Sequence, residues 1–197
     1  RLDGMELYDP FHLQDFGGPM SAIEPSLVGG ATLLMGAYPP SYGAAGAGVL
    51  DIRTRRPTRE KRALLGLDLL KMMFAAEGPV GDGAYLFAAR RGYVDLVLGI
   101  VDAIQPSDEQ FRPRYTDIYT KIEHPLDGGA KLSVSSLYAR DTNLIDKAGD
   151  ADDLDSAYEN SLTWARWRGP PSARVDVEVI PYVGYATADR IEGRLDR

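Results

Sequence analysis

The chain is organised around the stretch ATLLMGAYPPSYGAAGAGVLDIRTR, residues 31–55. It begins with a short apolar run that ends at Gly36 and closes with alternating apolar and polar residues from Val49 to Arg55. A Pro-rich turn, the pair Tyr42-Gly43 and a patch of small residues lie between them. Alternation is typical of a strand, and Gly and Pro mark turns. The stretch therefore predicts two short strands joined by a tight, glycine-dependent bend.

The segment before this stretch predicts little regular structure. Residues 1–8 read as a strand interrupted at Asp3-Gly4, which is a strong turn pair. Residues 9–19 form a loop that carries aromatic rings, and residues 21–27 predict a helical turn with Ser21 as its cap and Glu24 three positions later.

Composition excludes several classes of protein. The 197 residues carry 22 Lys and Arg against 29 Asp and Glu, a net charge of -7, which argues against nucleic acid as a partner. Cysteine is absent, so disulfides and thiolate metal sites are excluded. The sequence holds no apolar run long enough for a transmembrane helix.

From about residue 57 onward, alternating segments are separated by turn signals. In residues 114–123, for example, Asp117, Tyr119 and Lys121 share one face while Ile118 and Ile122 share the other. Such segments fit a soluble sandwich, and they fit a transmembrane barrel with an apolar outside and a polar lumen. Tyrosines and tryptophans near the strand ends suit the aromatic girdles of such a barrel: Tyr85, Tyr93, Tyr115, Tyr138, Trp164, Trp167, Tyr182 and Tyr185.

The connections favour the barrel. Short turns at 78–83, 125–129 and 169–172 alternate with long connections at 94–113 and 142–157, as periplasmic turns alternate with extracellular loops. The predicted strands are 59–66, 68–77, 84–93, 114–124, 130–141, 158–168 and 174–187. Seven strands cannot close a bacterial barrel, which uses an even number, so we expect the chain to be a fragment.

Several motifs, taken in order, resemble one family. They are Leu2 to Leu7 with its Asp-Gly pair, the DPFHL loop at 9–13, the apolar strand that ends at Gly36, Tyr42-Gly43, and the strand 48–54 that begins at Gly48. Glu77-Gly78-Pro79 and residues 90–93 extend the likeness into the following strands. Together they resemble the TonB-dependent outer-membrane receptors, from residue 1 to about residue 140.

The resemblance implies an architecture and an activity. The expected fold is mostly β: residues 1–56 form the C-terminal part of a plug domain, and residues 57–197 form the first strands of an incomplete antiparallel transmembrane β-barrel. Such receptors of the outer membrane import an external substrate, such as siderophore-bound iron, cobalamin or an oligosaccharide, through the plugged barrel. The implied partners are outer-membrane lipid and a TonB-type energy-coupling protein, whose binding segment lies outside this chain.

The resemblance also points to candidate substrate-binding residues, because the loop after the Asp-Gly strand lies at the outward apex of the plug in this family. The candidates are Tyr8, Asp9, Phe11, His12 and Gln14. The alternative is that Phe11 and Leu13 of this loop pack against the barrel wall. The residues Asp3, Gly4, Gly36, Tyr42, Gly43 and Gly48 are expected to serve backbone geometry and structure.

Other sites find little support in the sequence. His12 and His124 are the only histidines, and we expect both to have surface roles rather than to bind a metal. The acidic run at 150–155 fails the EF-hand spacing, and Gly46-Ala47-Gly48 precedes a strand where a dinucleotide motif requires a helix. No catalytic motif and no cofactor site is predicted. The alternative function is that of a non-transporting β-rich binding or adhesion module.

Overall fold

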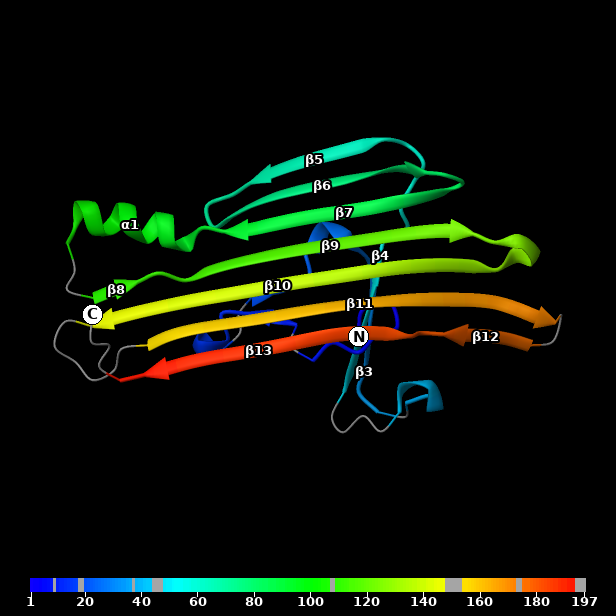
Figure 1. Cartoon of the computed structure of the whole chain (residues 1–197). Helices are drawn as coiled ribbons and strands as arrows, with labels where there is room; N and C mark the ends of the chain where they lie inside the picture. The colour runs from blue at the N-terminus through cyan, green and yellow to red at the C-terminus, as the bar shows by residue number, and fades with distance from the viewer. Residues whose placement is uncertain are drawn as a thin grey trace.

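One large antiparallel sheet dominates the computed structural model, which describes residues 1–8, 10–17, 20–36, 38–43, 48–106, 109–147, 154–172 and 175–193 (Figure 1). Its strands are β5 (Arg62–Leu67), β6 (Lys71–Val80), β7 (Gly83–Gly92), β8 (Glu109–Phe111), β9 (Arg114–Pro125), β10 (Lys131–Lys147), β11 (Leu154–Ser172), β12 (Val175–Val179) and β13 (Tyr182–Glu192). The order is β12-β11-β10-β9-β7-β6-β5, with β13 beside β11 and β8 beside β10. The protein is therefore mostly β, and the described part of the sheet is open rather than closed into a barrel.

The predicted strand positions are confirmed to within a few residues, but two strands are much longer than expected. β10 has 17 residues and β11 has 19, and their pairing continues without a break from Lys131↔Arg168 to Ile145↔Leu154. The long loop predicted at 142–157 is therefore wrong for most of its length. The seventh predicted strand is divided into β12 and β13.

A helix replaces the other predicted loop. α1 (Val94–Ile104) follows β7, and β8 lies between α1 and β9. The loop prediction for 94–113 was wrong because Leu96, Ile100 and Ile104 recur every four residues, which is a helical spacing. Arg114 holds α1 at the start of β9: its Nε lies 2.6 Å from the buried carboxylate of Asp95. None of the helices in the described ranges is long and apolar enough to cross a membrane.

The stretch at 31–55 forms two paired strands, as predicted. β3 (Val28–Leu34) runs antiparallel to β4 (Val49–Thr54), with Leu34 opposite Val49. The prediction of a tight bend is wrong, because the connection between the two strands covers residues 35–48 and includes the 3-10 turn η3 (Pro40–Tyr42). Gly36 and Gly43 have φ angles of 151° and 67°, so both glycines serve backbone geometry, as expected.

The first 27 residues make short elements around this pair. Asp3 and Gly4 form the predicted turn, with φ angles of 48° and 88°, and Leu2 bridges both Met5 and Ile52. The remaining elements are β1 (Phe11–His12), η1 (Gln14–Phe16), β2 (Met20–Ser21), η2 (Pro25–Leu27) and, in the turn between β9 and β10, η4 (Asp127–Gly129). The predicted cap was wrong: Glu24, not Ser21, caps the helical turn, which begins at Pro25.

The described residues of the segment 1–55 lie mostly against one face of the large sheet, with β3 and β4 running across the direction of its strands (Figure 1). We call this the inner face, and the opposite face the outer face. The core lies between the segment and the inner face. It joins Leu2, Met5, Ile23 and Leu27 to side chains of the sheet strands: Met73, Ala75, Leu86, Ala88, Tyr119, Leu137, Leu162 and Trp164.

Candidate functional site

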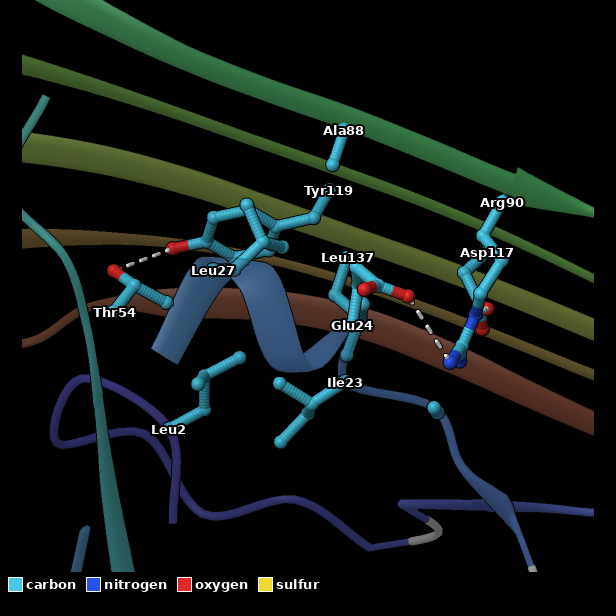
Figure 2. A pocket seen from close by; sticks show the side chains of 11 residues that line it. Leu2, Ile23, Glu24, Leu27, Thr54, Ala88, Arg90, Asp117, Tyr119 and Leu137 are labelled. Carbon is cyan, nitrogen blue, oxygen red and sulfur yellow. Dashed lines mark hydrogen bonds and ion pairs between the residues drawn. The ribbon is translucent and has the colours of Figure 1, made fainter. Parts of the chain in front are cut away.

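The apolar core is small, and it is surrounded by charged groups. Figure 2 shows Leu2, Ile23 and Leu27 facing the sheet, with Thr54 bonded to Tyr119 at one side and Glu24 paired with Arg90 at the other. The cavity among these side chains has a volume of about 10 Å³, which is room for no more than one water molecule. The core is therefore a packed contact between two elements and not a ligand site.

His12 lies at the centre of the first polar cluster. It is 1% exposed, and its two ring nitrogens contact Asp117 on β9 and Asp141 on β10. The backbone N–H of Leu13 donates to the second oxygen of Asp141 at 2.7 Å, and Arg90 Nε donates to the second oxygen of Asp117 at 2.5 Å. The expected surface role of His12 is thus wrong, because carboxylates of two neighbouring strands hold both ring nitrogens and the side chain is buried.

This geometry keeps the imidazole charged. Burial lowers the pKa of His12, but the hydrogen bonds and negative charges of Asp117 and Asp141 outweigh burial and raise that pKa from 6.5 to about 9. At neutral pH, the imidazolium and Arg90 face two carboxylates. Opposite charges that neutralise one another can be buried, whereas a lone charge cannot.

Asp15 is the centre of a second cluster on the same loop. Its carboxylate, 2% exposed, accepts hydrogen bonds from Asn143 Nδ2 at 2.9 Å and from Tyr158 Oη at 2.8 Å, and Arg190 lies 3.2 Å away. The Ser156 hydroxyl also donates to it. Burial raises the pKa of Asp15, but these donors and Arg190 outweigh burial, so the pKa lies below its usual value of 3.8.

Asp3 anchors the other end of the segment. It accepts hydrogen bonds from the backbone N–H of Thr54 at 3.0 Å and from the Thr54 hydroxyl at 2.5 Å, and Tyr119 Oη donates to it at 3.1 Å. Lys121 Nζ lies 3.3 Å from the same carboxylate. These contacts explain how Asp3 can serve structure, because its side chain joins β4 to β9.

Three further ion pairs connect the segment to the sheet. Glu24 lies 3.0 Å from Lys71 and 3.5 Å from Arg90, and Arg55 lies 2.6 Å from the buried carboxylate of Glu77. The inner face is therefore held to residues 1–55 by charges and hydrogen bonds as well as by the apolar core.

The candidate substrate-binding residues do not share one environment. Tyr8 is 77% exposed and Phe11 is 50% exposed, whereas His12 is enclosed. Phe11, His12 and Gln14 line an open pocket of about 160 Å³ against β10, β11 and β13, which we call the loop pocket. Asp9 lies outside the described residues. The alternative was that Phe11 and Leu13 pack against the barrel wall. Leu13 is buried, as that alternative expects, whereas Phe11 is half exposed.

Sequence reasoning missed the partners of this loop. It placed Asp117 on a polar face, yet nothing in the sequence linked that face to residues 105 or more positions earlier. The available signal was the unusual run of charged side chains at inward positions of successive strands, including Glu77, Arg90, Asp117, Lys121 and Asp141. A soluble sheet would place apolar residues there.

The outer face has the opposite character. Exposed apolar side chains cover it from β5 to β13, among them Leu65, Phe74, Ile118, Ile122, Val134, Val183 and Tyr185. At the end nearer α1 this surface ends in a polar row in which Arg91, Thr116, Arg140 and Glu159 are cross-strand neighbours. The apolar surface is thus a band with a defined edge.

Four of the predicted girdle residues lie on this band. By strand pairing, Tyr138 and Tyr185 lie next to the polar row, and Tyr85 and Trp167 lie toward the opposite edge. The prediction is wrong for Tyr115 and Trp164, which point inward and are 2% and 1% exposed. Tyr182 shares the inward face of its partner Trp164, and Tyr93 precedes α1 outside the strands.

Metal chemistry gains no support from the described residues, where no group of three or more His, Asp or Glu side chains is arranged to hold an ion. Most of the acidic run at 150–155 lies outside the described residues. Comparison of the sequence with family models and with curated proteins, and of the fold with solved structures, finds no match in any of the three.

Proposed function

We propose that the chain is part of a TonB-dependent outer-membrane receptor, with residues 1–56 belonging to its plug and residues 57–197 to its barrel wall. The observation that carries the proposal is the inversion of the sheet: its outer face is apolar and exposed, while its inner face is charged and covered. A sheet in water buries its apolar face, whereas a barrel wall in a bilayer turns that face to lipid and its polar face to the lumen.

The outward face of β9 is long enough to form part of a lipid-facing band. Beyond the polar row its residues run from Ile118 to His124, which at about 3.3 Å per residue is roughly 20 Å along the strand. Because barrel strands tilt by about 35–45°, this is roughly 15 Å of height, against about 25 Å for the whole apolar band of an outer-membrane barrel. The order of the motifs, from Asp3-Gly4 through Tyr42-Gly43 to the strand that follows Gly48, agrees with a plug that precedes the wall.

In this proposal the wall needs more strands than the described sheet contains. β5 lies at one edge, and β12 and β13 lie at the other. Unpaired N–H and C=O groups at such edges cannot be left in lipid. We expect further strands to join the two edges in the assembled receptor.

The polar contact between segment and sheet suits transport. A hydrogen bond exchanged for one with water changes the free energy by only about 0.5–1.5 kcal/mol, so a hydrated lumen can replace many of these contacts when a plug moves. The partners implied are outer-membrane lipid, an energy-coupling protein of the TonB type, and a small molecule or oligosaccharide that enters from the α1 end, where the loop pocket lies.

The absence of cysteine makes a direct test practical. Single cysteines replace Ala103 on α1 and Asp82 in the turn between β6 and β7, in the protein expressed from its natural gene in a Gram-negative bacterium. A membrane-impermeant maleimide should label Ala103→Cys in intact cells and Asp82→Cys only after lysis. The control is the unsubstituted chain, which should not react.

Recovery of the protein in the soluble fraction, with both cysteines equally reactive, would overturn the proposal. Membrane insertion without uptake of any solute in cells would instead support the alternative function, a non-transporting binding or adhesion module.

A further inference from the structure

A second and larger cleft opens on the inner face, away from the loop that carries His12. It has a volume of about 410 Å³ and lies between the end of β4 and the turn ends of β9, β10 and β11. Arg53 and Arg56 line it from the N-terminal segment, and Lys131, Arg166 and Arg168 line it from the sheet. We call it the basic cleft, and its size falls within the range of small-molecule sites.

Its positive charges are poorly compensated. Lys131 and Arg168 are direct cross-strand neighbours on β10 and β11, an arrangement that destabilises a sheet when both charges have the same sign. Glu178 stands opposite Arg168 on β12, but its carboxylate is bound to Arg166. Within the described part of the chain, neither Lys131 nor Arg168 forms an ion pair.

The two acidic side chains of the cleft are also engaged. Asp3 and Glu123 lie 3.3 Å and 2.9 Å from Lys121, which is itself 5% exposed. Arg56 on the facing wall has no carboxylate partner among the described residues. The cleft thus collects unpaired cations in a protein whose net charge is -7, so general composition does not explain it.

We propose that the basic cleft binds a small solute carrying two or more phosphate or carboxylate groups. Guanidinium groups bind such oxyanions through paired N–H donors, and an ammonium group adds a point charge. A bound oxyanion would lie between Arg56 on one wall and Lys131 and Arg168 on the other, and would remove the repulsion between the latter two. This site does not depend on the membrane proposal, because it uses only the inner face.

Calorimetric titration of the full chain with pyrophosphate, and separately with citrate, tests the site. We expect saturable binding of at least one probe, weakened tenfold or more in the double variant Lys131→Gln/Arg168→Gln. The matched control is Arg91→Gln/Arg140→Gln, which removes two exposed cations from the outer face and should leave the affinity unchanged. Preference for one probe distinguishes phosphate from carboxylate recognition.

A second variant, Arg56→Gln, changes the opposite wall and should also weaken binding. Circular dichroism checks that each variant folds. Absence of binding by both probes, or equal weakening in the inner-face and outer-face double variants, would overturn the proposal. Binding by a chain that fails to enter membranes would uphold this site while rejecting the proposed receptor.

Discussion

The two faces of the large sheet obey opposite rules. The inner face buries Glu77, Asp117 and Lys121, while the outer face leaves Phe74 and Val134 exposed. The two faces are formed by alternate residues of the same strands. The surroundings of each face explain the contrast. Charges are stable on the inner face because residues 1–55 bring opposite charges to it, whereas the outer face is an exposed apolar patch of the kind that marks an interaction surface.

We expect the greatest loss of stability from a substitution at the inner face. Replacing His12 by Gln removes a buried positive charge and leaves Asp117 and Asp141 facing one another. Breaking a buried ion pair typically costs about 3–5 kcal/mol. Equilibrium unfolding measures the loss of stability, and limited proteolysis shows whether residues 1–55 detach from the sheet.

The matched control is His124→Gln, near the turn end of β9, which should change stability by no more than about 0.5 kcal/mol. Equal effects of the two histidine variants would mean that the His12 cluster adds no stability of its own.

The same cluster predicts a dependence on alkaline pH. Because the pKa of His12 is raised from 6.5 to about 9, its stabilisation is complete below about pH 6.5 and is lost as the pH rises through about 9. The free energy of unfolding should therefore fall between about pH 7 and about pH 10. In the His12→Gln variant this part of the fall should disappear, and an unchanged pH profile would argue that the imidazole is neutral.

A charge placed on the outer face should distinguish lipid from water. Thr120 and Thr116 both point outward from β9, one within the apolar band and one in the polar row beside Arg91 and Arg140. In vesicles, Thr120→Arg should cost about 2–4 kcal/mol and Thr116→Arg about 0–1 kcal/mol, as measured by unfolding. Near-equal costs would contradict a bilayer around this face.

A smaller difference in stability is expected between variants of two carboxylates, Asp15 and Glu159. Asp15→Asn weakens the contacts with Asn143, Tyr158 and Arg190 and should cost about 1–3 kcal/mol. Glu159→Gln removes only an exposed carboxylate that accepts from Tyr185 on the outer face, and should leave stability unchanged.

Thermal unfolding compares the two carboxylate variants. Because the pKa of Asp15 lies below 3.8, its contribution is present above that pH and is lost as the pH falls. The effect of Asp15→Asn should therefore vanish in acid, and persistence of the difference there would argue against a charged carboxylate at this position.

The candidate site could be predicted only in part. The DPFHL loop was singled out in the sequence, and the loop does meet the sheet. His12, however, was expected at the surface, because a single histidine in a loop carries no sign of which strands will enclose it. The helix at 94–104 was missed for a different reason: it interrupts a long series of strands, and its helical spacing was outweighed by the expected alternation of loops.

Alternation along the chain was enough to predict that the sheet has two different faces, and turn signals were enough to predict the approximate limits of its strands. Side chains alternate along any strand, so the placement of Asp117 and Ile118 on opposite faces needs no knowledge of the rest of the fold. The structure shows which of these faces is covered, because Asp117 is buried and Ile118 is exposed. The charges that meet are known only from the three-dimensional fold. His12 contacts carboxylates 105 and 129 positions away, and Arg56 lines a cleft together with Lys131 and Arg168. Those contacts depend on the path by which residues 1–55 cross the sheet, and that path is set by packing over the whole chain rather than by any local pattern.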